Sequence, residues 1–231
     1  LGSIQPIAEI VKIAGDIPVH TDAVQSFGKV EFDFAALNVT AATISAHKIG
    51  GPLGVAALIL KRGLDLTPVL HGGGQEREIR SGTLNAPSIV AFTAAAEYAI
   101  ANMATNFKKI RELRDYFVTE LKKCVTDVSI NSITDPALPG IVNATFLGTE
   151  SDALLLLLDT EGISASAGSA CSAGVPRPSH VLVALGLSES DADASLRISI
   201  GTTNTKAEID QVLAILPSVV ERARNAFVVS E

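Results

Sequence analysis

Near its first quarter the sequence reads SAHKIGGPLG (residues 45–54), between two apolar runs at residues 39–44 and 55–60 that are typical of buried strands. A lysine at a strand end loses solvent on one side. Desolvation or a neighbouring cation lowers the pKa of such a lysine and increases the neutral amine that condenses with aldehydes. Lys48 is therefore a candidate Schiff-base lysine, with Ser45 and His47 as donors to an adjacent anion and glycines that let the backbone approach a flat ligand. The alternative is an exposed turn lysine between two strands.

The residues before this stretch predict helices alternating with short strands. Helical spacing predicts a helix over residues 6–14, a short strand follows at 18–22, and a short helix at 33–37. This alternation indicates an α/β fold with a mostly parallel sheet, in which ligands sit beyond the carboxyl ends of strands. Asp22 and Lys48 both fall at such ends, so we expect them to face one site.

Residues 68–83 form a glycine-rich, charged segment that is followed by the longest periodic pattern in the chain. A loop of this length in a compact protein is usually functional or disordered, and a mobile surface loop is the alternative. Apolar residues at helical spacing then predict a helix or a broken helix pair over residues 87–123. We place a domain boundary near its middle, with one domain over residues 1–103 and a second over 104–231.

The second half of the chain predicts a smaller α+β domain. Expected strands cover residues 141–147, 162–166 and 195–200, and expected helices cover 151–160, 178–185 and 206–227, the first of them capped by Ser151 or Asp152. Arg197 lies on the alternating strand 195–200, where it could clamp a substrate carboxylate or simply be a surface arginine at a strand edge.

The two cysteines have different surroundings. Cys171 lies within SASAGSACSAGVP (residues 164–176), a run of small residues that cannot pack a core. Cys171 is therefore expected to be exposed, either as a nucleophilic or sulfur-carrying thiol on a swinging loop or as an incidental cysteine in a flexible linker. Cys124 lies between Leu121 and Val125 at a helix end, and we interpret it as structural.

Composition excludes several classes of protein. The 231 residues carry 18 Lys and Arg against 25 Asp and Glu, a formal net charge of −7 without a basic cluster, which argues against nucleic-acid binding. No apolar run reaches the length that spans a membrane. Two distant cysteines predict neither a disulfide framework nor a metal cluster. The first residues lack the pattern of a signal peptide, so a cytoplasmic location is expected.

Six ordered motifs resemble the cysteine desulfurases of the NifS/IscS type, in the class V aminotransferase-like group of fold-type I pyridoxal phosphate enzymes. The motifs are HTDAVQS (20–26), SAHKIGGP (45–52), GGQER with RSGTLN (73–77 and 80–85), GSACS (168–172), PSHVL with ALG (178–182 and 184–186), and LRISIG (196–201). They span nearly the whole chain. The resemblance implies part of the large cofactor-binding domain, with a mostly parallel or mixed sheet, followed by a smaller C-terminal α+β domain. The extended loop of small residues around the cysteine resembles the NifS/IscS subtype rather than the SufS-like one.

The resemblance implies pyridoxal 5′-phosphate as the cofactor and assigns six residues to it, five within one subunit and Thr83 through a partner subunit. Lys48 would hold the cofactor covalently and move protons during the reaction, and Asp22 would pair with the ring nitrogen. Gln25 would form a hydrogen bond with the ring hydroxyl. Ser45 and His47 would hold the phosphate, and His47 is counted with Lys48 among the catalytic residues.

The resemblance also implies substrate and partners. Arg197 would bind the carboxylate of L-cysteine, and Cys171 would take the sulfur as a persulfide, leaving alanine. Thr83 would reach the phosphate of a partner subunit, which implies a homodimer. The sulfur would pass to an acceptor or an iron–sulfur scaffold protein.

Two alternatives remain at this level. One is another class V enzyme, such as a selenocysteine lyase or an aminotransferase, although a plain aminotransferase has no need of a mobile cysteine. The other is an inactive piece of a longer protein that serves only as an interaction module. The family has a longer N-terminal region with further cofactor contacts, so we expect a fragment with an unpaired sheet edge and weak or absent activity.

Overall fold

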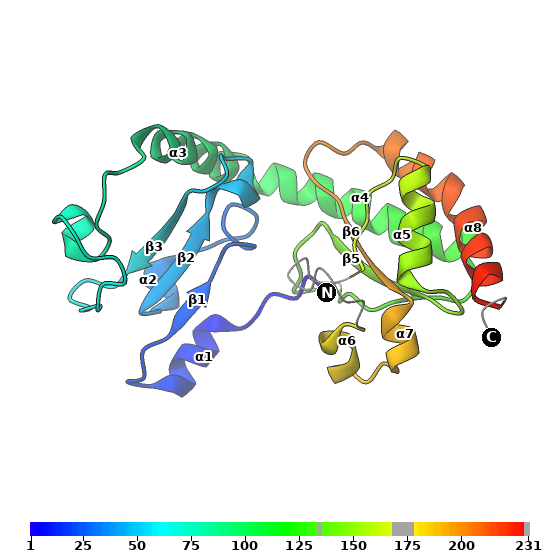
Figure 1. Ribbon diagram of the computed structural model, residues 1–231, viewed down its shortest axis with the longest axis horizontal. Coiled ribbons are helices and arrows are strands. Elements are labelled where there is room, and N and C mark those ends of the chain that lie inside the picture. The colour runs from blue at the N-terminus through cyan, green and yellow to red at the C-terminus, as the bar shows by residue number, and fades with distance from the viewer. Residues whose placement is uncertain (134, 168–177, 229–231) are drawn as a thin grey trace. The chain divides into compact units, whose positions relative to one another are not determined.

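The structure is a computed structural model that describes residues 1–133, 135–167 and 178–228. The chain divides into two compact units, Gln5–Asn106 and a second unit that combines Leu1–Ile4 with Phe107–Glu231 (Figure 1). Each unit has a three-stranded sheet and an apolar core of its own. Backbone hydrogen bonds from Leu138 N to Gly2 O (2.7 Å) and from Ile4 N to Pro136 O (3.1 Å) join the first residues to the second unit.

The sheet of the unit Gln5–Asn106 contains β1 (His20–Asp22), β2 (Ala41–Ser45) and β3 (Ala56–Leu60). β1 runs parallel to β2, and β2 runs antiparallel to β3. The described strands therefore form a mixed sheet, whereas the alternation of helices and strands favours a mostly parallel one. Residues 46–55, which connect β2 to β3, are too few for the crossover that a parallel pair requires.

The helices of this unit lie where the sequence predicts them. They are α1 (Ile7–Ala14), α2 (Phe34–Leu37) and α3 (Ala86–Ala101), with 3₁₀ turns η1 (Ala46–Ile49) and η2 (Gln75–Glu78). The Asp33 carboxylate caps α2, because Oδ1 accepts hydrogen bonds of 2.9 Å from the amides of Ala35 and Ala36. Phe92 of α3 is buried in the same core cluster as Ala23, Ile44 and Ala46. Helix α3 therefore covers the ends of β1 and β2.

The long periodic segment is a broken helix pair, as one of the two predictions has it. α3 ends at Ala101 and α4 (Met103–Cys124) begins two residues later. Between them Asn102 donates hydrogen bonds from its backbone N and its Nδ2 to the carbonyl of Tyr98, at 3.1 Å and 2.8 Å. The first of these is the ordinary helical bond between residues four apart, and the second adds a side-chain donor to the same carbonyl at the end of α3.

The sheet of the second unit is antiparallel throughout, in the order β4 (Val128–Ile130), β5 (Ile141–Phe146) and β6 (Ser195–Ser199). The helices after α4 are α5 (Ser151–Thr160), α6 (His180–Ala184), α7 (Glu189–Asp193) and α8 (Lys206–Val228). Fully buried side chains from α4, β5, α5 and α8 form its core, with Phe117, Phe146, Leu154 and Leu216 among the largest. This unit thus has the predicted α+β composition.

Two local predictions for this unit are wrong, and two short elements were missed. Residues 162–166 form no strand; only a single bridge joins Ser166 to Arg197, because alanine and serine side chains add little cross-strand packing. Helix α5 has Glu150 at its N-cap and no capping side chain, so the predicted caps Ser151 and Asp152 lie inside the first turn. The short elements β4 and α7 were not predicted, since three to five residues carry too little periodicity.

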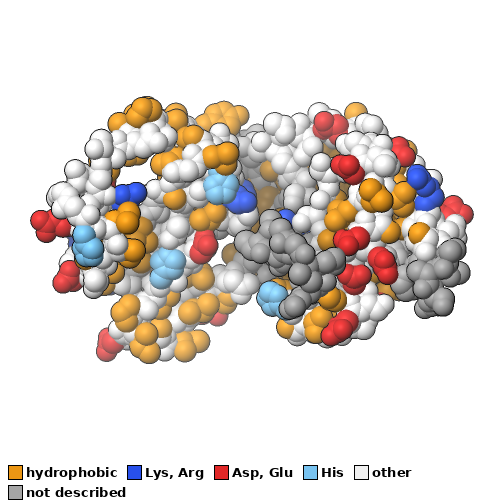
Figure 2. Space-filling model, in the orientation of Figure 1, with side chains coloured by type: hydrophobic (Ala, Val, Ile, Leu, Met, Phe, Trp, Pro, Cys, Tyr) orange, Lys and Arg blue, Asp and Glu red, His pale blue; other side chains and the backbone are white. Residues whose placement is uncertain are grey.

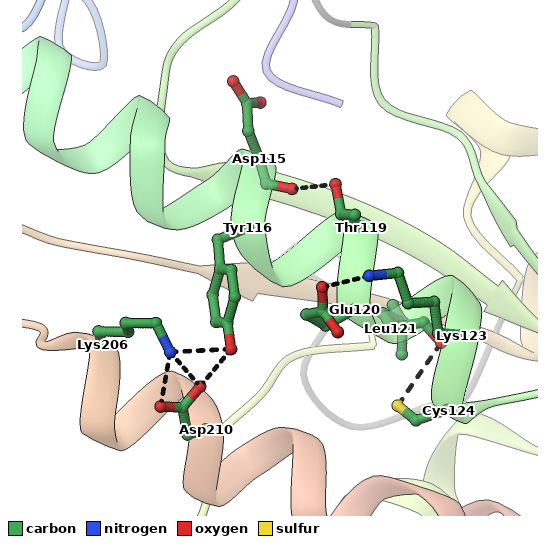
Figure 3. Close-up of polar contacts among 9 residues, drawn as sticks. All are labelled: Asp115, Tyr116, Thr119, Glu120, Leu121, Lys123, Cys124, Lys206 and Asp210. Atoms are coloured by element: carbon green, nitrogen blue, oxygen red, sulfur yellow. Dashed lines mark hydrogen bonds and ion pairs between the residues drawn. The ribbon is translucent and has the colours of Figure 1, made fainter.

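α4 and α8 are joined by a polar cluster on the protein surface (Figure 3). Tyr116 Oη donates a 2.6 Å hydrogen bond to Asp210 Oδ1, and Lys206 Nζ contacts both of them at 2.9–3.0 Å. The hydrogen bond to Asp210 raises the pKa of Lys206, and the hydrogen bond from Lys206 lowers the pKa of Asp210. Cys124, interpreted from the sequence as structural, lies at the end of α4 and is exposed, whereas Leu121 and Val125 beside it are buried.

Acidic side chains gather over α5 and α7 on the face of the second unit shown in Figure 2. Among them, the pKa of Asp193 is raised, first by its partial burial and then by the negative charges of Glu150 and Asp152. Asp193 also ends α7, where the helix dipole disfavours a negative charge. Glu150, Asp152 and Asp193 thus repel one another in the part of the chain that the structure describes.

Candidate functional site

Two neighbouring parallel strands bring the central predicted residues to one edge of the first sheet. Asp22 is the last residue of β1 and pairs in register with Thr43 of β2. β2 ends at Ser45, and η1 continues from it with His47 and Lys48. Because side chains alternate along a strand, Asp22, Thr43 and Ser45 lie on the same face of the sheet. The expectation that Asp22 and Lys48 both follow strand ends agrees with this arrangement.

Ser45 and His47 are directly linked. Ser45 Oγ lies 2.7 Å from His47 Nδ1, and the serine is 92% buried while the histidine is exposed. The contact occupies Nδ1 and fixes the orientation of the ring, so that a ligand would meet Nε2. With a neutral imidazole the pair offers an anion one donor, either Nε2–H or the Ser45 hydroxyl, and with a protonated imidazole it offers both.

Lys48 follows in the same 3₁₀ turn and is exposed. The turn ends at Gly50, which has a φ of 84°, a value that favours glycine. Gly51 is needed for packing, because a Cβ there would lie 2.9 Å from Ala46 Cβ and 3.2 Å from Ala95 Cβ. Glycine at this position therefore allows the loop to pack closely against η1 and α3.

The Asp22 carboxylate and Gln25 belong to the turn that leaves β1. Asp22 Oδ1 accepts a 2.9 Å hydrogen bond from Val24 N, which orients the exposed carboxylate. Gln25 Oε1 accepts a 3.0 Å hydrogen bond from Lys29 Nζ. Since an ammonium can only donate, this contact assigns the oxygen of the Gln25 amide and leaves its NH₂ as the donor for a ligand.

Two further residues, His20 and Lys29, lie at this edge, and the sequence alone assigns no role to either. His20 Nε2 lies 2.8 Å from Thr43 Oγ1 and shares its face of the sheet with Asp22. Burial, and then the positive charge of Lys48, lowers the pKa of Lys29. The spacing i, i+2 from His20 to Asp22 and i, i+4 from Gln25 to Lys29 is the signal that could have indicated both residues.

Thr83 follows the segment of residues 72–82, whose two ends are held together by hydrogen bonds that involve side chains of the segment. Buried Ser81 donates a 2.7 Å hydrogen bond to Gly73 O, and Gly82 N donates to Gln75 Oε1 at 3.1 Å. Within this segment Glu76, Arg77 and Glu78 all have φ between 48° and 63°, a left-handed conformation that is unfavourable for side chains other than glycine. Thr83 itself is exposed.

The remaining predicted residues belong to the second unit. Arg197 is half-buried in β6, paired in register with Asn143 of β5. Its backbone exchanges hydrogen bonds with Ser166, at 3.1 Å for Ser166 N to Arg197 O and 2.6 Å for Arg197 N to Ser166 O. Cys171 lies outside the described residues.

Among the described residues there is no cluster of three or more histidine, cysteine, aspartate or glutamate side chains that could hold a metal ion. No helix in the described ranges is long and apolar enough to cross a membrane.

Comparison with known proteins gives a consistent family. Residues 1–212 match the family model for class-V aminotransferases. An IscS-like cysteine desulfurase of Mycobacterium tuberculosis is 45% identical over 229 residues, which are 98% of this chain and 58% of the relative. A cysteine desulfurase IscS of Dictyoglomus turgidum is 40% identical over 227 residues, 97% of this chain and 58% of the relative. The chain thus spans somewhat more than half the length of these relatives.

Solved structures similar to this chain support the same family. The X-ray structure of a NifS-like protein from Rickettsia africae superimposes with a TM-score of 0.86 at 36% identity, covering 95% of this chain and 59% of that one. The structure described as SspA in complex with cysteine gives a TM-score of 0.70 at 35% identity, covering 89% of this chain and 57% of the other. The predicted class, an α/β enzyme fold of the NifS type, is confirmed by these similarities.

Proposed function

The chain belongs to the class-V aminotransferase family, and on this basis we propose that the protein is a pyridoxal phosphate-dependent cysteine desulfurase that converts L-cysteine to L-alanine. The observation that carries the proposal is the sheet edge where β1 and β2 end, because two parallel neighbours deliver Asp22 and the linked pair Ser45–His47, followed by Lys48, to the same place. The relatives named cysteine desulfurase support the choice of reaction.

The donor set at this edge fits the cofactor. A phosphate needs hydrogen-bond donors, which Ser45 and His47 would supply. A protonated ring nitrogen needs a carboxylate, and Asp22 has one oxygen fixed by Val24 N and a second available for such a contact. Gln25, whose NH₂ is free to donate, would bind the ring hydroxyl. When bound, pyridoxal phosphate supplies a ring that accepts electrons from the substrate.

Lys48 would hold the cofactor covalently and move a proton at the substrate Cα. An exposed amine in a turn directly after β2 can reach a ligand that rests on the strand ends. Lys29 would act through Gln25, because its ammonium holds the amide oxygen. His47, whose Nδ1 is occupied by Ser45, would have Nε2 for the cofactor or substrate.

Three residues would complete the reaction. Arg197 would bind the substrate carboxylate, for which a guanidinium fork is well suited. The Cys171 thiolate would form an S–S bond with the substrate sulfur while the C–S bond breaks, and the carbon left behind would take a proton to become alanine. Thr83 would contact the phosphate in a partner subunit, so a homodimer is part of the proposal. A sulfur-acceptor or iron–sulfur scaffold protein would receive the persulfide.

The test measures cofactor binding, alanine and persulfide in the protein and three variants. Lys48→Ala should lose the visible absorption band of the lysine-linked cofactor and the formation of alanine. Cys171→Ser should keep the band and lose alanine and persulfide. Cys124→Ser is the matched control and should keep everything, since the pKa of the Cys124 thiol is raised, chiefly by partial burial. Alanine formation that survives in Cys171→Ser would point to a different class-V reaction.

A further inference from the structure

Arg114 is a charged side chain inside the second unit, remote in sequence from every residue of the proposed reaction. It lies in α4 between the apolar core positions, and its side chain is only 5% exposed. Burial of a guanidinium donor without an acceptor is unfavourable, so native proteins normally satisfy the five donors of a buried arginine. Among the described residues Arg114 Nε is a buried donor with no hydrogen-bond acceptor.

The neighbouring carboxylate satisfies this charge only in part. Asp115 Oδ1 lies 2.6 Å from Arg114 Nε, yet the N–H bond is not directed at it, so the contact is an ion pair without a hydrogen bond. Asp115 Oδ2 also lies 3.9 Å from Arg111 Nε. Figure 3 shows the Asp115 carboxylate pointing away from Tyr116 and α8. Two guanidinium groups thus share one carboxylate, which leaves a net charge of one positive unit.

The two arginines line a cavity of about 350 Å³, which is in the range of small-molecule sites. One part of its wall is apolar, formed by Val118, Ile130 and Val142. The polar part includes Ser132, whose Oγ accepts a 2.8 Å hydrogen bond from Asn143 N and can therefore donate its hydrogen to a ligand. Thr119 also lines the cavity, but its hydroxyl already donates to Asp115 O at 2.8 Å.

A second hollow, of about 340 Å³, lies between α4 and α8 and differs from the cavity at Arg114 in how its charges are paired. Its charged residues are already paired: Asp210 contacts Tyr116 and Lys206, and Glu120 contacts Lys123 at 2.7 Å (Figure 3). That hollow offers a ligand no unsatisfied buried group. The cavity at Arg114 instead has two guanidinium groups and one carboxylate in its lining, so its positive charge exceeds its negative charge.

We propose that the cavity at Arg111 and Arg114 binds a small organic carboxylate with a short apolar body. A carboxylate matches the planar fork of a guanidinium, and its single negative charge balances the net positive charge of the site. The apolar wall opposite would cover a chain of a few carbon atoms. The proposal is independent of the cofactor site and of the proposed reaction.

The experiment titrates the purified protein with acetate, butyrate and inorganic phosphate while following the arginine Nε–H signals by NMR. The Arg114 signal, identified by its absence in Arg114→Lys, should shift saturably with butyrate. Affinity should rise about fourfold for each methylene between acetate and butyrate, if these groups are buried. Phosphate, with its greater charge and no apolar body, should bind more weakly than butyrate.

Variants separate the site from general effects of charge. Arg111→Met, which changes an exposed side chain and should fold normally, is expected to weaken butyrate binding about tenfold. Lys108→Met on the same helix is the matched control and should bind as the unchanged protein does. The proposal is wrong if butyrate causes no saturable shift, or if Arg111→Met and Lys108→Met bind butyrate equally.

Discussion

Lys29 Nζ donates a 3.0 Å hydrogen bond to Gln25 Oε1 across one turn of the segment that leaves β1. Because lysine has no acceptor, the contact determines which end of the amide faces outward. Lys29, whose pKa is lowered chiefly by burial, thus orients Gln25, the residue proposed to bind the cofactor ring.

Replacing Lys29 by Met should weaken pyridoxal phosphate binding about fivefold, the value of one hydrogen bond, because Gln25 is then free to rotate. The melting temperature should not fall. Since burial lowers the pKa of Lys29, its charged form destabilises the folded state at neutral pH, and methionine removes this charge. An absorption titration and thermal unfolding give both quantities, with exposed Lys12→Met as the control. Unchanged cofactor affinity would leave Lys29 without a positioning role.

Replacing Ser45 by Ala should separate the phosphate from the rest of the cofactor. The hydroxyl holds His47 at 2.7 Å, so both proposed phosphate donors are affected. We expect about a tenfold loss of affinity for pyridoxal phosphate, since the lost bonds would be made to a charged group, and little loss for pyridoxal, which has no phosphate. Fluorescence or absorption titrations with the two compounds measure the difference. An equal loss for both would indicate a general disturbance of the β2 end.

Gly51 should not tolerate a methyl group. A Cβ at this position would lie 2.9 Å from Ala46 Cβ and 3.1 Å from Ala46 O, so Gly51→Ala should reduce the free energy of unfolding by about 1–3 kcal/mol. Denaturant unfolding measures the loss. Gly74→Ala is the control, because φ at Gly74 is −83° and its Cβ would only touch Glu78 Cγ at 3.9 Å. A similar loss in both variants would contradict a packing role for Gly51.

Asp193→Asn should stabilise the protein at pH 7. The pKa of Asp193 is raised in the folded state by burial and by Glu150 and Asp152, so the folded protein binds this proton more tightly than the unfolded chain. Stability is therefore lost as the pH rises from the usual carboxyl value of 3.8 through the raised pKa. Because Asp193 is only partly buried and solvent screens the repulsion from its neighbours, we expect a gain of only about 1 °C in melting temperature.

The pH dependence distinguishes this effect from a local change of helix propensity. The advantage of Asp193→Asn should shrink on acidification and vanish below pH 3.8, where both states carry the protonated acid. Glu189→Gln, at the start of the same helix, should give no such gain. An advantage that persists at low pH would exclude charge repulsion as its cause.

Much of the fold could be predicted because its elements carry strong local signals. The apolar runs around Ser45 and His47 predict β2 and β3, and the long apolar periodicity predicts α3 and α4. What local signals do not contain is the direction of pairing, so the antiparallel pairing of β3 with β2 follows only from the short connection between them. Short elements such as β4 and α7 were missed for the same reason, since each has too few residues to show a period.

The candidate site could be predicted only in part. Short motifs indicate Asp22, Ser45, His47 and Lys48, and the parallel register places Asp22 beside Thr43 near the end of β2, which no single motif contains. Lys29 contacts Gln25 and His20 contacts Thr43, and such contacts depend on the turn after β1 and on the pairing of β1 with β2, which no motif contains. The roles of Thr83, Arg197 and Cys171 remain predictions.

The pairing of Asp22 with Thr43 has a consequence for how the chain can vary in length. Residues added to the loops between β1 and β2 leave the register unchanged, because loop closure costs little per added residue. One residue inserted within β2 would instead turn Ser45 to the opposite face of the sheet, since side chains alternate along a strand. If single residues are inserted at each position from 30 to 45, the protein should therefore tolerate insertions up to the start of β2 and not beyond it. This limit does not depend on which ligand the site binds.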